Sequence, residues 1–340
     1  MIGLPGSASP IRRSRGSAGG GAGSGDGPRE ILTIVGPTGV GKTAVAVAVA
    51  KRLRAEIVSA DSRQIFRGMD IGTAKPTAAE RADVLHHMID IVDPTDAYDA
   101  SRFASDAERV IARLLGGGIE PIVVGGTGFY LASLFEGLFE GAGRDDDARE
   151  ELRARLEREG AAALHRELAE VDPAAAKRIH PNDAARIVRA LEVFRSTGRP
   201  LSEWQSDPTR TPGYRARYVA LTMDRGSLNT LIERRVEAMM EAGLLEEVRR
   251  LVASGQLREG TQAASAVGYR ELIPLVEDPA AVDPDDLAAA IEEIKRNTRR
   301  YAKRQVTWFS QLPGATWLDV GDFDAEEAAG EVLARWREAA

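Results

Sequence analysis

The segment Ile31-Leu32-Thr33-Ile34-Val35 leads directly into Gly36-Pro37-Thr38-Gly39-Val40-Gly41-Lys42-Thr43, which is followed by residues 44–53. The first part is a short apolar run rich in β-branched residues, typical of a buried strand, and the last part has the composition of a helix. Strand, G-x-x-x-x-G-K-T and helix in this order are the pattern of a phosphate-binding P-loop. Its glycines let backbone N–H groups surround phosphate oxygens, Lys42 supplies a cation, and Thr43 supplies a hydroxyl ligand for Mg²⁺. The segment therefore predicts a bound polyphosphate, with residues 36–43 as its binding loop.

The P-loop alone does not decide which phosphate compound is bound or whether a phosphoryl group moves. The chain lacks the Asn-Lys-x-Asp signature of GTPases and the His-Arg-Asp catalytic loop of protein kinases. Further motifs must therefore identify the reaction.

Two further segments place polar residues at the ends of expected strands. Asp61-Ser62-Arg63-Gln64 follows an expected strand over residues 56–60, and Gly125-Gly126-Thr127-Gly128-Phe129-Tyr130 follows another over residues 121–124. Ligands of open α/β sheets bind at the carboxyl ends of the strands, so both segments are expected to face one ligand. On spacing alone, a helix cap at Asp61 and a turn hydroxyl at Thr127 remain alternatives.

Composition limits the class of protein. The 340 residues are 43% hydrophobic and 29% charged, with a formal net charge of −7, and they suffice for about two domains. No apolar run approaches the roughly 20 residues that cross a bilayer, so a membrane-spanning role is excluded. The chain has no cysteine, which excludes disulfides, thiolate zinc sites and a cysteine nucleophile, and its four scattered histidines argue against a His-based metal cluster. This composition fits a reducing cytoplasm.

The chain divides into an α/β core, a helical insertion and two terminal segments. Residues 1–28 are rich in Gly, Ser, Pro and Arg and are expected to be a disordered tail, with a transit peptide as the alternative. Residues 137–212 show helical spacing and almost no strand signal, so they are expected to form a helical insertion. The expected core is then 29–136 together with 213–320, and residues 321–340 are expected to form a C-terminal helix or tail.

One segment near the C-terminus is strongly basic. Residues 295–304 contain six basic residues among ten and no acidic residue. Solvated helix faces alternate the sign of their charges more often than this run does, so phosphate binding is expected there, and a solvated face is the alternative. A nucleic-acid substrate would explain such a patch in a chain that is acidic overall.

Taken together, the motifs resemble those of the tRNA dimethylallyltransferase family, also called tRNA isopentenyltransferases. The resemblance extends from about residue 32 to about residue 318. The segments that carry it are, in chain order, Gly36–Thr43, Asp61–Gln64, Gly68–Pro76, the Ile-Asp-Ile-x-Asp-Pro segment ending at Pro94, Gly125–Tyr130, Arg178–Asp183, Arg186–Phe194, Val267–Glu271 and Arg304–Phe309.

The resemblance implies a P-loop NTPase-like parallel sheet with a helical insertion domain, and a specific reaction. Its P-loop would hold the diphosphate of dimethylallyl diphosphate, with Mg²⁺ as cofactor, and the prenyl group would pass to N6 of adenosine 37 in tRNA. By the same resemblance, Asp61 is the general base, Thr127 contacts the diphosphate or its bridging oxygen, and Arg225 helps to hold the diphosphate. Leu231 stands where many members have arginine, which leaves Arg225, Arg234 and Arg235 as the available cations.

The resemblance also implies that the partner is the anticodon stem-loop of tRNA, and we expect a cytoplasmic monomer. The expected tRNA-binding residues are Asp61, Ser62, Arg63, Gln64, Thr127, Asn182, Asp183, Arg186, Arg296, Arg299, Arg300 and Lys303. The alternative hypotheses are an adenylate isopentenyltransferase that uses free AMP, a small-molecule P-loop kinase, and an RNA-binding protein with a vestigial P-loop. An AMP-using enzyme would need no long basic surface, and an intact Lys42, Thr43 and Asp61 argue against a vestigial loop.

Overall fold

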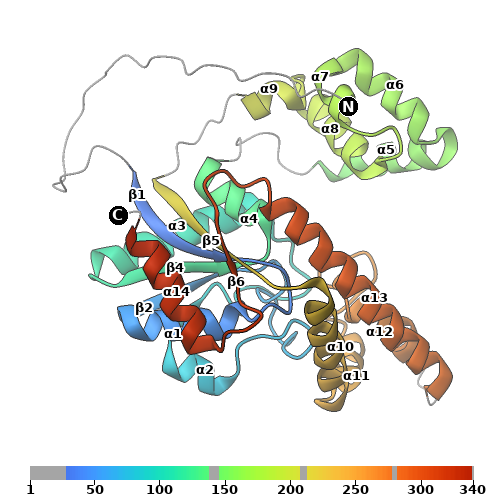
Figure 1. Ribbon diagram of the computed structural model, residues 1–340. Coiled ribbons are helices and arrows are strands. Elements are labelled where there is room, and N and C mark those ends of the chain that lie inside the picture. Colours follow the sequence, from blue (N-terminus) through green and yellow to red (C-terminus); the bar gives the residue numbers. More distant parts are fainter. Residues whose placement is uncertain (1–27, 138–144, 207–212, 278–281, 339–340) are drawn as a thin grey trace, which may run out of the picture.

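The computed structural model describes residues 28–137, 145–206, 213–277 and 282–338 (Figure 1). The expected tail therefore lies almost wholly outside the described residues. Six parallel strands form one sheet in the order β3-β2-β4-β1-β5-β6. Their bounds are Arg29–Val35 (β1), Ala55–Ala60 (β2), His86–His87 (β3), Glu120–Gly125 (β4), Tyr214–Thr222 (β5) and Thr316–Asp319 (β6). The predicted α/β core with a parallel sheet is confirmed.

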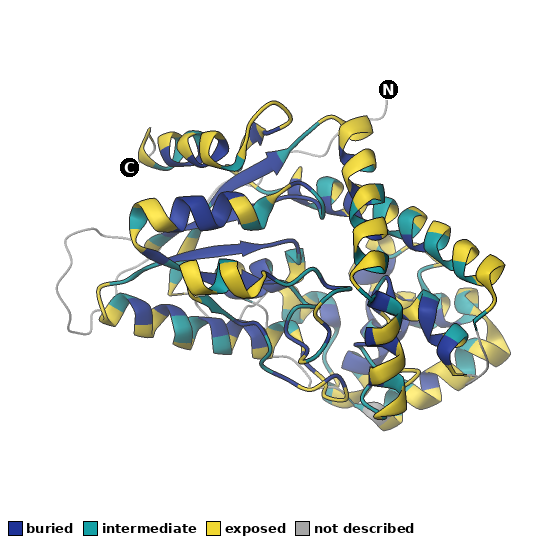
Figure 2. Cartoon of the chain, turned by 90° about the horizontal axis from the view of Figure 1, so that it is seen from below, coloured by how far each residue is buried: buried dark blue, intermediate teal, exposed yellow. Residues whose placement is uncertain are grey.

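Helices cover both faces of the sheet, as a parallel sheet requires. Side chains of β1 alternate between the two sides: Leu32 and Ile34 join one hydrophobic cluster, whereas Ile31 and Val35 join the other. Buried strand residues appear as dark blue between the helices in Figure 2. One face is covered by α1 (Lys42–Leu53) and α14 (Ala325–Glu338), and the other by α3 (Ala100–Gly116), α4 (Gly128–Ala132) and the π-helix η1 (Ser133–Gly137).

The C-terminal helix α14 is part of the core, whereas the expected core ended at residue 320. It packs on α1, and its buried residues recur at helical spacing. They are Ala328, Ala329, Val332 and Leu333, all at most 4% exposed. An amphipathic stripe of this kind is stabilised by burial, so α14 belongs to the layer that covers the sheet.

The register of the three central strands brings three loops to one edge of the sheet. Val35 at the end of β1 pairs with Gly125 at the end of β4, and Gly125 also pairs with Ala60 at the end of β2. The next residues, Gly36, Gly126 and Asp61, therefore begin their loops at the same level. This arrangement, set by the sheet, is what positions the candidate site.

The helical insertion has a core of its own. It consists of α5 (Asp146–Glu159), α6 (Ala161–Val171), α7 (Pro173–Arg178), α8 (Ala184–Thr197) and α9 (Leu201–Ser206). Leu152, Leu168 and Leu191 are all at most 1% exposed within its hydrophobic cluster. The connecting residues 138–144 and 207–212, which the expected insertion 137–212 includes, lie outside the described part of the chain.

The remaining helices stand beside the carboxyl edge of the sheet. They are α2 (Ala78–Asp83), α10 (Arg225–Glu241), α11 (Leu244–Ala253), α12 (Tyr269–Val276) and α13 (Pro284–Phe309). The 26 residues of α13 pack against α10, α12 and α4, so this helix spans from the outer helices to the loop after β4. Among the described residues, no helix has both the length and the apolar character needed to cross a membrane.

Candidate active site

A cavity of about 570 Å³ opens where the three loops meet α10 and α13. Its size is within the range of small-molecule sites. The lining includes Lys42 and Thr43 of the P-loop, Asp61 after β2, and Arg235 and Gln305 from the two helices. Residues more than 260 positions apart in the sequence thus line one space.

The P-loop has the backbone conformation that its glycines permit. Gly36, Gly39 and Gly41 have φ angles of 151°, 87° and 91°, a region that side-chain-bearing residues rarely adopt. Lys42 Nζ donates to the carbonyl oxygens of Gly36 at 2.9 Å and Pro37 at 2.8 Å. Burial lowers the pKa of Lys42 to about 8, and the Asp61 carboxylate opposes this shift. An anion in the loop would favour the charged lysine.

Two side chains from distant helices contact the P-loop at Thr38. Arg235 Nη1 donates to Thr38 Oγ1 at 3.2 Å, and the Thr38 N–H donates to Gln305 Oε1 at 2.8 Å. Gln305 Nε2 in turn donates to the carbonyl oxygen of Gly126 at 2.9 Å. Burial lowers the pKa of the Arg235 guanidinium, and Asp61 opposes that effect. Arg235 therefore adds a second cation to the phosphate loop.

Asp61 is held through one of its two carboxylate oxygens. Asp61 Oδ1 accepts from the N–H groups of Arg63 at 2.8 Å and Gln64 at 3.3 Å. In the described part of the chain, Asp61 Oδ2 has no hydrogen-bond partner, and the residue lines the cavity. One oxygen therefore fixes the turn while the other is available as a proton acceptor.

The loops after β2 and β4 are joined through Thr127. Its Oγ1 accepts from the Ser62 N–H at 3.0 Å and lies 3.3 Å from Ser62 Oγ, while a side-chain hydrogen bond links Thr127 to Tyr301. Arg63 Nη1 donates to the carbonyl oxygen of Gln262 at 2.5 Å, and burial lowers the pKa of Arg63. The expected residues 61–64 and Thr127 thus form one hydrogen-bonded unit.

The buried carboxylate of Glu247 fixes the backbone of residues 70–72, which belong to a further loop beside the cavity. Glu247 Oε2 accepts from the N–H groups of Asp70 and Ile71, each at 2.9 Å, and Oε1 accepts from the Gly72 N–H at 3.2 Å. Gly72 and the two residues after it line the cavity. The position of this loop therefore depends on a residue of α11.

The residues present fit a magnesium ion that takes most of its ligands from a phosphate compound and water. Among the described residues, no group of three or more His, Cys, Asp or Glu side chains could enclose a metal. Thr43 and Asp61 line the same cavity and offer a hydroxyl and a carboxylate. Mg²⁺ typically takes one or two protein ligands and fills its remaining positions with phosphate oxygens and water.

The expected tRNA residues of the insertion lie on its surface. Asp183 caps α8 by accepting from the Arg186 N–H at 3.2 Å, and Arg186 Nε lies 3.3 Å from an Asp183 carboxylate oxygen. Asn182 and Arg186 are exposed. Asp183 thus has a structural role as a helix cap, whereas Asn182 and Arg186 are accessible to a ligand.

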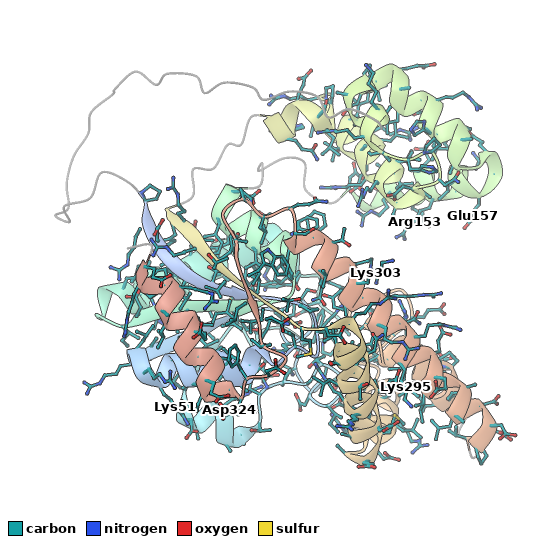
Figure 3. All side chains as sticks on the ribbon, in the orientation of Figure 1. Lys51, Arg153, Glu157, Lys295, Lys303 and Asp324 are labelled. Atoms are coloured by element: carbon teal, nitrogen blue, oxygen red, sulfur yellow. The ribbon has the colours of Figure 1, made fainter. Side chains whose placement is uncertain are left out.

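The basic run lies within α13 and has two unlike halves. Lys295 pairs with Glu237 and Glu292, Arg296 pairs with Glu293, and Arg299 pairs with Glu233. Figure 3 labels Lys295 and Lys303 at different levels of this helix. Within the ranges that the structure describes, Arg300 and Lys303 have neither an ion pair nor a side-chain hydrogen bond, and both are exposed. Arg304 lines the cavity and lies 5.8 Å from the Tyr301 ring centroid.

Arg225 does not line the cavity. It is the first residue of α10, it is exposed, and it is absent from the lining. Arg235 lies three helical turns later on the same helix and does line the cavity, whereas Arg234 is exposed. The sequence could show three cations, but only the packing of α10 shows which of them faces the P-loop.

Sequence reasoning missed the roles of Gln305 and Glu247. Gln305 and Tyr301 belong to the helix with the basic run, and the spacing of Tyr301, Gln305 and Trp308 at i, i+4 and i+7 marks one helix face. A polar residue on that face was the available signal for Gln305. For Glu247, an acidic residue beside Val248 and Leu251 on the apolar face of α11 was the signal.

Comparison with known proteins agrees with this geometry. A family model described as IPP transferase matches residues 64–312, and one described as Isopentenyl transferase matches residues 29–89. The chain belongs to the IPP transferase family. A tRNA dimethylallyltransferase of Syntrophobacter fumaroxidans is 47% identical over 296 residues, covering 86% of this chain and 84% of that one. The corresponding protein of Geobacillus kaustophilus is 42% identical, with coverage of 90% and 96%.

Solved structures of the IPP transferase family resemble the chain as well. The tRNA isopentenylpyrophosphate transferase of Bacillus halodurans has a TM-score of 0.65 and 39% identity, covering 91% of this chain and 97% of that one. A eukaryotic dimethylallyltransferase acting on tRNA has a TM-score of 0.70 and 28% identity, with coverage of 86% and 74%. The fold and the family are therefore shared over nearly the whole length.

Proposed function

We propose that this chain transfers the dimethylallyl group of dimethylallyl diphosphate to N6 of adenosine 37, next to the anticodon of tRNA, and releases diphosphate. The observation that carries the proposal is a single cavity lined by both the phosphate loop and the Asp61 carboxylate. A diphosphate in the loop would therefore lie within the same space as a proton acceptor. The relatives from Syntrophobacter fumaroxidans and Geobacillus kaustophilus are tRNA dimethylallyltransferases, which supports the same reaction.

The phosphate loop would stabilise the leaving diphosphate. Its backbone N–H groups, the N-terminus of α1, Lys42 and Arg235 all bring positive charge to one end of the cavity. As the bond between the prenyl carbon and the bridging oxygen breaks, its electron pair passes to the diphosphate. Positive charge already present around the diphosphate oxygens lowers the activation barrier for bond cleavage, because negative charge develops on those oxygens.

Asp61 would take the proton from the attacking amine. The exocyclic nitrogen of adenine forms the new bond to the prenyl carbon, and one N6 proton must leave for the product to be neutral. Asp61 Oδ1 already holds its turn, so Oδ2 is the atom that we assign to this proton. Thr127, linked to Ser62 and Tyr301, would keep the neighbouring loop in place for the same step.

Magnesium would contribute charge neutralisation on the diphosphate when it is bound. Thr43 is the protein ligand that we assign to it, because Thr43 is the second residue of α1, next to Lys42, and lines the cavity.

The tRNA would meet the chain at α13 and at the insertion. Arg300 and Lys303 are exposed cations without acidic partners in the described structure, and Asn182 and Arg186 are exposed on the insertion. We assign the contact with the anticodon stem-loop to these residues, and the helical unit 145–206 to tRNA binding. We further propose that the chain acts as a monomer, and that it acts in the cytoplasm, where tRNA is used.

One assay separates this proposal from its rivals. Purified protein with Mg²⁺ and dimethylallyl diphosphate is given either tRNA or AMP, and in a separate arm ATP replaces the prenyl donor. We expect prenylated tRNA without ATP and no prenylated AMP. Prenylation of AMP would indicate an adenylate isopentenyltransferase, and phosphoryl transfer from ATP would indicate a kinase; either result contradicts the proposal.

A further inference from the structure

The C-terminal half of α13 packs closely on the loop after β4. Gln305 Nε2 donates to the Gly126 carbonyl oxygen at 2.9 Å, and a Cβ added at Gly128 would lie 2.1 Å from Trp308 Nε1. Trp308 is one turn beyond Gln305 on the same helix face, and Gln305 lines the cavity. The Trp308 ring therefore lies just outside the cavity, against the backbone of the loop that carries Thr127.

An exposed phenylalanine rests on this tryptophan. Phe129 is 58% exposed, although it lies only two residues after Thr127. Its ring centroid is 4.9 Å from that of Trp308, with 46° between the ring planes. Tryptophan supports one side of Phe129, and the rest of the ring faces solvent.

A single exposed hydrophobic residue is ordinary on a protein surface. Whether Phe129 belongs to a binding surface therefore depends on the residues around it. Arg300 and Arg304 precede Trp308 by eight and four residues, which places both along the stripe of α13 that ends at Trp308. Both are exposed and have no acidic partner among the described residues, and Arg304 lines the cavity. Aromatic rings beside unpaired cations are the combination that binds unpaired nucleotides, since the rings stack on bases and the cations bind phosphates. The other half of the basic run, already paired with glutamates, lies farther from Trp308.

We propose that Phe129 and Trp308 form a stacking platform for the anticodon-loop base that adjoins the target adenosine. The inference rests on the proposed function. A base that undergoes chemistry must leave its stack, which exposes a face of its neighbour. The platform is in the right place to cover that face, because it borders the cavity without lining it. The platform therefore contributes to RNA binding and does not contact the transferred prenyl group.

The test compares variants of the exposed ring. Phe129→Ala is expected to raise the Kd for an anticodon stem-loop about 5- to 100-fold, the range that loss of one base–aromatic stack implies. Phe129→Tyr should restore binding because it retains the ring. The Kd for inorganic pyrophosphate and the single-turnover rate at saturating tRNA should not change. Phe323→Ala, which removes a ring that is 41% exposed in the segment before α14, is the matched control and should leave RNA binding unchanged.

A fluorescent base identifies the nucleotide. Stem-loops with 2-aminopurine at position 36 or at position 38 are bound to wild-type protein and to Phe129→Ala. We expect quenching by the wild type at one of the two positions, and its loss in the variant. Unchanged Kd and unchanged fluorescence at both positions would overturn the inference, as would a variant that also loses pyrophosphate binding, since Phe129 would then only support the fold. If wild-type protein prenylates AMP and does not bind tRNA, the proposed function itself fails.

Discussion

The carboxylate of Glu247 on α11 accepts a hydrogen bond of 2.5 Å from the hydroxyl of Tyr269, the first residue of α12. The same carboxylate accepts three backbone N–H groups from residues 70–72. Burial, followed by the nearby Glu247, raises the pKa of Tyr269, so the phenol remains a donor. A loop of the cavity is thus fixed by a charge that is only 6% exposed.

Glu247→Gln should destabilise the protein. A glutamine amide has one acceptor oxygen and one NH₂ group, so its NH₂ would face a backbone N–H that needs an acceptor. We expect a loss of about 1 to 3 kcal/mol in the free energy of unfolding, measured by urea denaturation. Glu246→Gln, one residue earlier and with a side chain that is 68% exposed, is the matched control and should change stability little. Equal stability of the two variants would show that the loop is held by other contacts.

Asp61→Asn should abolish most prenyl transfer while preserving the fold. Asparagine retains the oxygen that accepts from Arg63 and Gln64, but it cannot take the N6 proton. Loss of a positioned general base lowers the rate about 10²- to 10⁴-fold, measured in a single turnover with both substrates saturating. The exposed Asp322→Asn is the control and should retain the wild-type rate. A normal rate for Asp61→Asn would remove it from the mechanism, and a lowered melting temperature with weak substrate binding would reassign it to structure.

Diphosphate binding should weaken above pH 8. Because burial lowers the pKa of Lys42 to about 8, the side chain is charged below that pH and loses its proton above it. A neutral lysine does not attract diphosphate, so the Kd for inorganic pyrophosphate should rise about tenfold between pH 7 and pH 9 by proton linkage. Calorimetry measures the Kd for pyrophosphate at several pH values for the wild type and for Lys42→Met. Titration of pyrophosphate itself affects both proteins equally, so the difference between the two pH profiles is due to Lys42. Identical pH profiles would show that Lys42 does not carry the dependence.

The two halves of the basic run should differ in their contribution to tRNA binding. Replacing Arg300 and Lys303 by alanine removes two unpaired cations, and each lost phosphate contact lowers the slope of log K against log salt by roughly 0.7 to 0.9. Replacing Lys295 and Arg296 by alanine removes the same charge. Both are paired with glutamates, so their loss should change the salt slope of tRNA binding less. Filter binding at several salt concentrations measures both slopes. Equal slopes for the two double variants would mean that the ion pairs open when tRNA binds.

The sequence was sufficient to predict which loops meet at the candidate site, because the sheet determines their positions. The P-loop, Asp61 and Thr127 each follow a strand, and neighbouring parallel strands in register place their following loops together. The strand-loop-helix order at residues 31–53 therefore predicted the fold class, and it is the basis of the proposed phosphate loop. These inferences needed only local patterns.

Contacts between distant helices could not be predicted in this way. Arg235 rather than Arg225 faces the cavity because of how α10 packs, which no local spacing reveals. Likewise, Glu233 and Glu237 of α10 pair with Arg299 and Lys295 of α13, so a run that looks uniformly basic in sequence is half neutralised in the fold. Tertiary packing decides both cases.

The most direct test of the proposed reaction is the position of the modification in tRNA. Protein, Mg²⁺, tRNA and ¹³C-labelled dimethylallyl diphosphate are incubated without ATP, and the tRNA is digested and mapped by mass spectrometry. The proposed function predicts one labelled dimethylallyl group on adenosine 37, attached at N6, and none with Asp61→Asn on the single-turnover timescale of the wild type. Label on another nucleotide, label on free AMP alone, or an absolute requirement for ATP would contradict it.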